Sequence, residues 1–281
     1  MRYLVAVSGG IDSVVLLDKL ASSGEHELIV AHFDHGIRGD SADDARFVSV
    51  LAALYGLPFV STREELGEGA SEERARHRRY AFLRQAARMH EAMIATAHHA
   101  DDVIETIAIN IQRGTGWRGV AVLTTPGIER PLLAMTKADI RAYALKKRLE
   151  WVEDSTNASE KYLRNRLRHR ITAQLSSQQK QAAQAIWQQQ LALKTAIEQE
   201  LANYSNAQGE YSRYYLAQID EQSASELLRA AIMAKTNLSP TRPQLKRALL
   251  AIKTARPRTS YELGAGVKLW FNVRTFIVET P

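Results

Sequence analysis

The sequence has 281 residues and a formal net charge of +6, and it contains no cysteine. At ~150 residues per domain this length predicts one large domain or two ordinary ones, and 45% apolar and 24% charged residues are typical of a folded globular protein. Disulfides, thiolate metal sites and iron–sulfur clusters are excluded because they need cysteine. No apolar run approaches the ~18–20 residues of a membrane span, and the first one is too short for a signal peptide, so we expect a cytoplasmic protein with no membrane contact.

Apolar runs that predict strands alternate with helical spacing through the first half of the chain. The predicted strands are 3–7, 28–33, 58–60 and 93–97, and the predicted helices are 13–20, 43–55, 72–90 and 101–112. This alternation indicates an α/β fold, a doubly wound parallel sheet covered on both faces. Ligands in such folds bind beyond the carboxyl ends of the strands, and glycine, serine and charged residues directly follow three of the predicted strands.

The pattern changes after residue 131. The predicted helices there are 136–148, 176–203, 225–235 and 243–253, followed by a β-hairpin of 261–263 and 267–278. The first of these helices starts with Thr136 and Asp139, which resemble a capping box with Asp in place of Glu. We place a boundary near residue 175, which gives a catalytic domain over 1–175 and a mainly helical region with a terminal β-hairpin over 176–281. Residues 1–160 have a net charge of −4 and residues 161–281 one of +10. A basic second part favours a polyanionic partner, although an ordinary solvated surface remains the alternative.

The stretch Ser-Gly-Gly-Ile-Asp-Ser at 8–13 follows the first predicted strand. Its glycines permit positive φ and close approach of the backbone, and the amides of such a turn and of the next helix suit a phosphate. It is not a Walker A loop, because no Gly-Lys-Ser/Thr follows, and an ordinary βα turn is the alternative. The motif resembles the pyrophosphate-binding loop of the N-type ATP pyrophosphatases, which have the adenine nucleotide alpha hydrolase-like (Rossmann-like) fold. The resemblance implies that ATP is bound by Ser8, Gly9, Gly10, Ile11, Asp12 and Ser13.

Two further groups of charged residues follow. Asp34 ends a predicted strand at the ligand edge, and Arg38 can contact a phosphate or a carboxylate. Arg76 and Tyr80 lie four residues apart, on one face of a predicted helix. For Asp34 and Arg38 the alternative is a helix cap beside a surface arginine. For Arg76 and Tyr80 it is a charged helix that is simply solvated.

The stretch Ala-Thr-Ala-His-His-Ala-Asp-Asp-Val-Ile-Glu-Thr at 95–106 combines a strand end with a helix start. His98 follows the strand, and Asp102 and Glu105 share one helix face, where carboxylates near an ATP site can hold Mg²⁺. Helix-start carboxylates favoured by the macrodipole are the alternative, but they do not account for the paired histidines. An Arg-Gly-Thr-Gly stretch then begins at Arg113, Asp-Ser-Thr-Asn occupies 154–157, and residues 161–170 are strongly basic.

In this order, the motifs over about residues 3–170 resemble the tRNA(Ile)-lysidine synthetases in their compact form. One departure is Val-Ala-Val at 120–122, where that family usually has Leu-x-Gly. The resemblance implies a ligase that uses ATP to adenylate the C2 oxygen of the wobble cytidine in the CAU anticodon of tRNA(Ile). L-Lysine then displaces AMP and forms lysidine, so that the tRNA reads AUA instead of AUG and accepts isoleucine instead of methionine.

The resemblance also suggests roles for single residues. Asp34, Asp102, Arg38 and Arg113 are the candidate catalytic residues, and His98 joins residues 8–13 at the nucleotide. Asp102 and Glu105 are the candidate Mg²⁺ ligands. The candidate tRNA contacts are Arg76, Arg164, Arg166 and Arg168, since phosphate contacts position a nucleic acid. We expect a monomer or a homodimer.

Two other functions remain open at this point. Another enzyme of the same superfamily would share the loop, but its tRNA thiolases typically use cysteine, and its small-molecule synthetases would not need a basic tail. A nucleotide-dependent RNA-binding protein without turnover is the other alternative. The presence of Asp12, His98, Asp102 and Glu105 argues against it.

Overall fold

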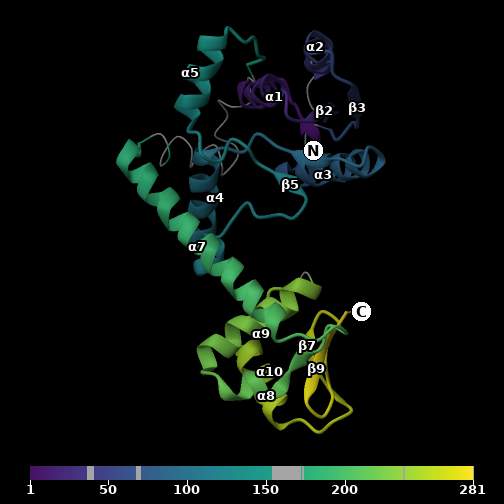
Figure 1. The fold of residues 1–281 in the computed structure, drawn as a ribbon, viewed down its shortest axis with the longest axis vertical. Coiled ribbons are helices and arrows are strands. Elements are labelled where there is room, and N and C mark those ends of the chain that lie inside the picture. Colours follow the sequence, from purple (N-terminus) through teal and green to yellow (C-terminus); the bar gives the residue numbers. More distant parts are fainter. Residues whose placement is uncertain (37–40, 68–70, 154–171, 173, 237, 281) are drawn as a thin grey trace. The chain divides into compact units, whose positions relative to one another are not determined.

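The computed structural model describes residues 1–36, 41–67, 71–153, 172, 174–236 and 238–280 (Figure 1). Within these ranges the chain forms two compact units, Met1–Gln188 and Gln189–Pro281. No helix in the described ranges is both long and apolar enough to cross a membrane. Each unit is described by itself.

The first unit contains a five-stranded parallel sheet in the order β3-β2-β1-β4-β5. The strands are β1 (Arg2–Ala6), β2 (Glu27–Asp34), β3 (Phe59–Arg63), β4 (Met93–Ala95) and β5 (Ile128–Glu129). The order runs outward in opposite directions from β1 and β4, so the gap between these two strands is the switch point of a doubly wound sheet, where ligands bind. The predicted fold class is confirmed.

Helices bury both faces of this sheet. The helices of this unit are α1 (Ile11–Ser23), α2 (Ser41–Leu54), α3 (Glu72–Met89), α4 (Ala100–Gln112), α5 (Lys137–Lys147) and the beginning of α7 (Ser177–Asn203), with a short 3₁₀ turn at Trp117–Gly119. Successive strand residues point to opposite faces: Val5 belongs to the apolar cluster that contains Leu16 of α1, whereas Leu4 belongs to the cluster that contains Leu83 of α3. Two buried faces explain why the strand sequences are continuously apolar.

The turn between α1 and β2 lies at the amino edge of the sheet. α1 ends at Gly24, which has a φ of +65° and whose N–H donates to Ala21 O. A side chain at Gly24 would meet no atom within 4 Å. The chain then enters β2 through the exposed Glu25. The connections that carry residues 8–13, the end of β2 with Asp34, and His98–Asp102 lie at the opposite, carboxyl edge, whereas Arg113 follows α4 at the amino edge.

The second unit combines helices with a four-stranded antiparallel sheet in the order β6-β9-β8-β7. Its elements are the end of α7, β6 (Tyr211–Ser212), α8 (Arg213–Gln218), α9 (Glu221–Lys235), α10 (Arg242–Thr254), β7 (Thr259–Gly264), β8 (Val267–Phe271) and β9 (Thr275–Glu279). The predicted hairpin is present as β7 and β8, but residues 267–278 form two strands and not one. The turn between β8 and β9 contains Val273, which is 75% exposed. Because valine is apolar, residues 267–278 resemble one continuous strand in the sequence.

Arg213 is the most extensively bonded buried side chain of this unit. It is 9% exposed, and its guanidinium donates to the carbonyls of Ile252 at 2.8 Å, Ala255 at 2.7 Å and Asn272 at 2.8 Å. The first two carbonyls close the end of α10, where the last turn of a helix lacks partners of its own. Arg213 thereby joins α10 to the turn between β8 and β9.

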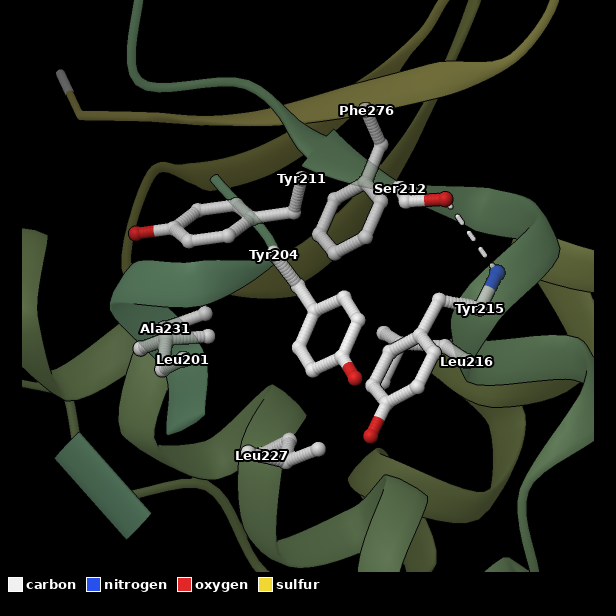
Figure 2. Close-up of a pocket in the computed structure, with 9 residues that line it drawn as sticks. All are labelled: Leu201, Tyr204, Tyr211, Ser212, Tyr215, Leu216, Leu227, Ala231 and Phe276. Carbon is white, nitrogen blue, oxygen red and sulfur yellow. Dashed lines mark hydrogen bonds between the residues drawn. The ribbon is translucent and has the colours of Figure 1, made fainter. Parts of the chain in front are cut away.

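The tyrosines of the second unit pack locally (Figure 2). The rings of Tyr204 and Tyr215 stack with centroids 3.3 Å apart, and Tyr215 Oη donates to Glu200. Tyr211 lies against Phe276. These residues line a small pocket inside the unit, so their aromatic faces are used in packing, in contrast to the exposed Tyr214.

Candidate active site at the carboxyl edge of the parallel sheet

The turn after β1 requires glycine at position 9, the second residue of the stretch 8–13. Gly9 has a φ of +94°, a conformation that costs other residues about 1–2 kcal/mol. A Cβ at Gly9 would also lie 3.4 Å from Phe47 Cδ1 and 3.6 Å from a methyl group of Val48, both on α2. Gly10 then serves as the N-cap of α1, without a side chain to cover the helix end.

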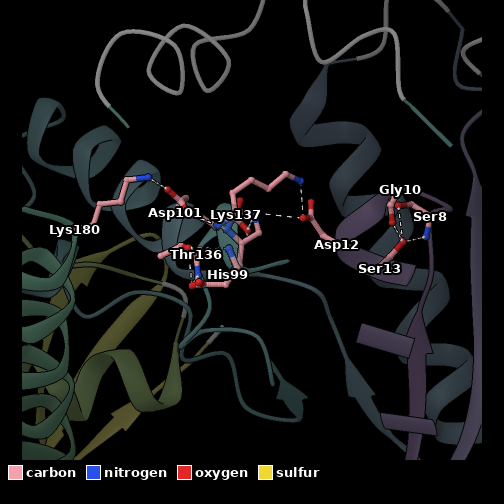
Figure 3. Close-up of polar contacts among 11 residues, drawn as sticks. Ser8, Gly10, Asp12, Ser13, His99, Asp101, Thr136, Lys137 and Lys180 are labelled. Atoms are coloured by element: carbon pink, nitrogen blue, oxygen red, sulfur yellow. Dashed lines mark hydrogen bonds and ion pairs between the residues drawn. The ribbon is translucent and has the colours of Figure 1, made fainter. Parts of the chain in front are cut away.

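Two serines brace this turn from inside (Figure 3). Ser13 Oγ donates to Gly10 O at 2.8 Å and accepts from the N–H of Ser8 at 3.2 Å. Ser8 Oγ lies 3.3 Å from the same hydroxyl. The first amides of α1 have no carbonyl of their own helix to bind, and the N-cap supplies no side chain. The start of α1 therefore has the geometry that binds anions in other proteins.

His99, at the start of α4, brings the two loops of the switch point together. Its side chain is nearly fully buried, with Nε2 3.5 Å from Asp102 Oδ2 and 3.9 Å from Asp12 Oδ1. Its backbone N–H donates to Asp102 Oδ2 at 3.0 Å. Asp12 comes from the turn after β1 and Asp102 from the helix after β4, so these carboxylates converge on one histidine.

Asp101 holds two lysines from distant parts of the chain (Figure 3). It is buried, its Oδ2 accepts from the backbone N–H of Lys137 at 2.7 Å, and its Oδ1 accepts from Lys180 Nζ at 2.5 Å. Lys137 is the first residue of α5, and its Nζ donates to Asp12 Oδ1 at 2.6 Å. An alternating line of charges thus runs from α7 through α4 and α5 to α1.

The start of α5 is fixed by a capping box that the sequence predicted. Thr136 Oγ1 accepts from the N–H of Asp139 at 3.2 Å, and Asp139 Oδ2 accepts from the N–H of Thr136 at 2.8 Å. The hydrogen bonds from Thr136 hold the pKa of the Asp139 carboxyl below its usual value. The backbone of Lys137 is therefore held at both ends of its peptide unit, by this cap and by Asp101.

The predicted metal ligands differ in accessibility. Asp102 keeps 13% of its side-chain exposure, whereas Glu105, one turn farther along α4, is fully buried. No group of three or more His, Asp or Glu that could hold a metal ion is found among the described residues. The partly exposed oxygens of Asp12 and Asp102 suit Mg²⁺ bound by one or two carboxylates together with substrate phosphates.

Asp34 lies at the end of β2, next to β1 in the sheet. It is buried, its Oδ1 accepts from the N–H of Gly36 at 2.9 Å, and its Oδ2 accepts from Arg63 of β3 at 3.2 Å. Burial, and then the charge of Arg79, lower the pKa of the neighbouring His35 to about 4. Asp34 therefore lies at the carboxyl edge of the sheet, as predicted, and its carboxylate is paired with the guanidinium group of Arg63.

The other predicted residues are His98, Arg76, Arg113 and four arginines that lie outside the described residues. His98 Nδ1 lies 2.9 Å from Thr96 Oγ1. Arg76 stacks over the Tyr80 ring, 5.0 Å from its centroid, and Arg113 is an exposed C-cap of α4. Outside the described residues lie Arg38, Arg164, Arg166 and Arg168.

Sequence reasoning missed four members of the cluster, namely His99, Asp101, Lys137 and Lys180. The two α4 residues stand inside the motif at 95–106, but nothing in it distinguishes them from His98 and Asp102. Lys137 follows the predicted cap at Thr136, which places it at the carboxyl edge. Its partner Asp12 lies 125 residues earlier, and no local pattern links the two.

Comparisons with known proteins identify the family of the chain. A family model described as the PP-loop domain matches residues 1–175. The chain is 35% identical to a tRNA(Ile)-lysidine synthase of Solibacter usitatus, over 90% of this chain and 57% of the relative. It is 41% identical to a tRNA(Ile)-lysidine synthase of Geobacter sulfurreducens, over 62% and 40%. The chain therefore spans about half the length of these curated relatives.

A solved structure shares the fold. The U34-tRNA thiolase NcsA from Methanococcus maripaludis superposes with a TM-score of 0.57 and 18% identity, covering 69% of this chain and 72% of the thiolase chain. At this identity the likeness concerns the fold alone.

Proposed function

The chain belongs to the PP-loop domain family, and we propose that it is a tRNA(Ile)-lysidine synthase. In this proposal ATP binds at the turn Ser8–Ser13, the C2 oxygen of the wobble cytidine of a CAU-anticodon tRNA(Ile) is adenylated, and L-lysine displaces AMP. The observation that carries the proposal is the meeting of Asp12 and Asp102 at His99, across the gap between β1 and β4. The names of the two curated relatives support the choice of substrate.

The first step transfers the adenylyl group. The cytidine oxygen attacks the α-phosphorus, a new P–O bond forms, and the bond to the β-phosphate oxygen breaks to release pyrophosphate. The free amides at the start of α1 and the Ser8 hydroxyl would stabilise the charge that develops on the leaving group. Mg²⁺ held by Asp12 and Asp102 would supply further positive charge, and we favour this pair over Glu105 because Glu105 is fully buried.

The second step joins the amine. The neutral ε-amine of lysine attacks C2, AMP leaves with the former C2 oxygen, and the amine loses a proton. We propose Asp34 and Asp102 as the carboxylates that orient the amino groups of the substrate. We propose Arg38 and Arg113 as contacts to phosphate, and His98 as a contact to the nucleotide.

The tRNA would be held by basic residues. Arg76 and the arginines 164, 166 and 168 are proposed phosphate contacts, which position the anticodon loop without selecting its sequence. The wobble base itself must leave its stack to reach the site. We further propose that 1–175 is the catalytic domain, that 176–281 assists in tRNA binding, and that the reaction takes place in the cytoplasm.

The test measures AMP formation by the purified chain with ATP, unmodified CAU tRNA(Ile) and each amino acid in turn. We expect AMP formation that depends on lysine. Asp102→Ala should lower it at least ~100-fold, as expected for a group that acts at the reacting atoms, while tRNA affinity changes less than ~3-fold. Asp102→Asn keeps an oxygen that can accept from the backbone N–H of His99. It should be equally inactive, because the proposed role of Asp102 needs its negative charge. Asp43→Ala, an exposed aspartate of α2, is the control.

Two results would contradict the proposal. One is AMP formation that is indifferent to lysine. The other, for Asp102 alone, is a normal rate in the Asp102→Ala variant with intact tRNA binding.

A further inference from the structure

The PP-loop turn has no lysine of its own, yet the structure brings one to it. Walker A loops place a lysine beside the phosphates, whereas residues 8–13 contain none. The ammonium group of Lys137, at the start of α5, lies 2.6 Å from Asp12 Oδ1 in the first turn of α1 (Figure 3). We propose that Lys137 is a phosphate-binding residue that donates to a β- or γ-phosphate oxygen of ATP. This inference rests on the proposed ATP site and adds a residue to it.

The backbone of Lys137 is fixed while its side chain is accessible. The capping box of Thr136 and the bond to Asp101 Oδ2 hold the peptide unit. The side chain keeps 48% of its exposure and Asp12 keeps 32%, so the contact between them is open to solvent and to a ligand. An ammonium has three donors and can bind a phosphate oxygen while it retains Asp12.

The charges around the turn favour this role. Lys137 pairs with Asp12, and Lys180 pairs with Asp101. A triphosphate brings several negative charges to the start of α1, and a lysine beside it offsets them. Lys180 is held by the buried Asp101 at 2.5 Å and is 22% exposed, so Lys137 is the more accessible of the two cations. Asp101 is then a positioning residue, because it orients Lys137 through the backbone.

A simpler role for Lys137 is to neutralise Asp12. Removing the lysine would weaken anion binding in either case, because a bare Asp12 carboxylate would repel phosphate. The two roles separate when Asp12 carries no charge. A lysine that contacts phosphate still matters in an Asp12→Asn background, whereas a lysine that only screens Asp12 does not.

The experiment is a double-mutant cycle with the full chain and inorganic pyrophosphate, measured by calorimetry without divalent cations. Wild type, Lys137→Met, Asp12→Asn and the double variant are compared, with circular dichroism as the check on folding. Lys137→Met should weaken binding roughly 10- to 100-fold, the range of a hydrogen bond between charged groups. In the Asp12→Asn background the same change should still cost at least ~10-fold. Lys146→Met, at an exposed position near the end of the same helix, should stay within ~2-fold of wild type.

Lys137→Arg and Lys137→Gln test whether the positive charge is needed, and they replace Lys137→Met if that variant does not fold. Arginine should recover part of the affinity and glutamine should not. A change of less than ~2-fold on replacing Lys137 in the Asp12→Asn background would overturn the inference, as would a wild-type chain that binds no pyrophosphate.

The measurement uses neither tRNA nor lysine. A chain that binds pyrophosphate through Lys137 but forms no AMP with lysine would contradict the proposed function and support this inference. The converse result, lysine-dependent AMP formation with no contribution from Lys137 in the cycle, would contradict only the inference.

Discussion

The two units of the chain use buried polar side chains for different ends. In the first unit, Asp101 and His99 join α4 to residues of α1, α5 and α7, and the contact between Lys137 and Asp12 beside them stays open to solvent. In the second unit, Arg213 gives its donors to three backbone carbonyls. Both arrangements satisfy buried charge. Only the first arrangement has partly exposed charged groups, Lys137 and Asp12, at a sheet edge where a ligand can bind. The second holds a helix end and a turn together.

The largest expected effect concerns Arg213. Arg213→Met removes the donors of three carbonyls, and each buried group left without a partner costs about 1–3 kcal/mol. We expect the free energy of unfolding to fall by about 3 kcal/mol or more in chemical denaturation, with pyrophosphate affinity at 20 °C unchanged in the folded protein. Arg247→Met, on the exposed side of α10, is the control. If Arg213→Met lowered pyrophosphate affinity as much as it lowered stability, the assignment of a purely structural role to Arg213 would be wrong.

A glycine pair compares strain in the two units. Gly9→Ala and Gly209→Ala each force alanine into positive φ, +94° and +75°, at about 1–2 kcal/mol of stability. Gly9→Ala should in addition weaken pyrophosphate binding ~10-fold, because the strain at this φ falls on the turn that is proposed to hold the anion. At Gly209 the nearest atom is the flexible end of Lys235, at 3.5 Å, and binding should not change. Equal binding by both variants would show that the turn does not hold the anion.

The smallest expected effect is a pH dependence confined to the first unit. Burial, with Arg79, lowers the pKa of His35 to about 4 in the folded state, from 6.5. Between these values the unfolded chain binds the extra proton, so stability is fully present above pH 6.5 and falls as the pH drops towards 4. Partial exposure reduces the effect to about 1 kcal/mol. Denaturant titrations of wild type and His35→Gln should therefore converge at low pH, whereas parallel curves would contradict the assignment.

Periodicity predicted most of the fold because the long helices bury one face and the long strands of the first unit alternate between two buried faces. Residues 28–31 alternate between the two apolar clusters, and the observed strand, β2, extends the predicted range 28–33 by one residue at each end. The two-residue strands β5 and β6 are too short for any period. The helix predicted at 225 begins at Glu221, because Asp220 caps it by accepting from the N–H of Ser223, a signal that the apolar pattern alone does not contain.

The candidate site was predictable only where it coincides with a local motif. Residues 8–13 and Asp102 stand out by spacing, because a glycine turn and a helix start need particular residues at fixed positions. Lys137 and Lys180 do not, because their role comes from strand order and helix packing that bring them to Asp12 and Asp101. His99 lies against the carboxylates of Asp12, Asp101 and Asp102, and the sequence alone does not show which of two adjacent histidines takes this place.

The turn between α1 and β2 offers a place to attach a reporter. It lies at the amino edge of the sheet, and Glu25 there is exposed. Because the chain has no cysteine, Glu25→Cys would create a unique thiol for a fluorophore or a spin label. Such a label would sit a full strand length from the phosphate-binding turn, so it could follow the tumbling of the protein with and without RNA while leaving the nucleotide site chemically intact.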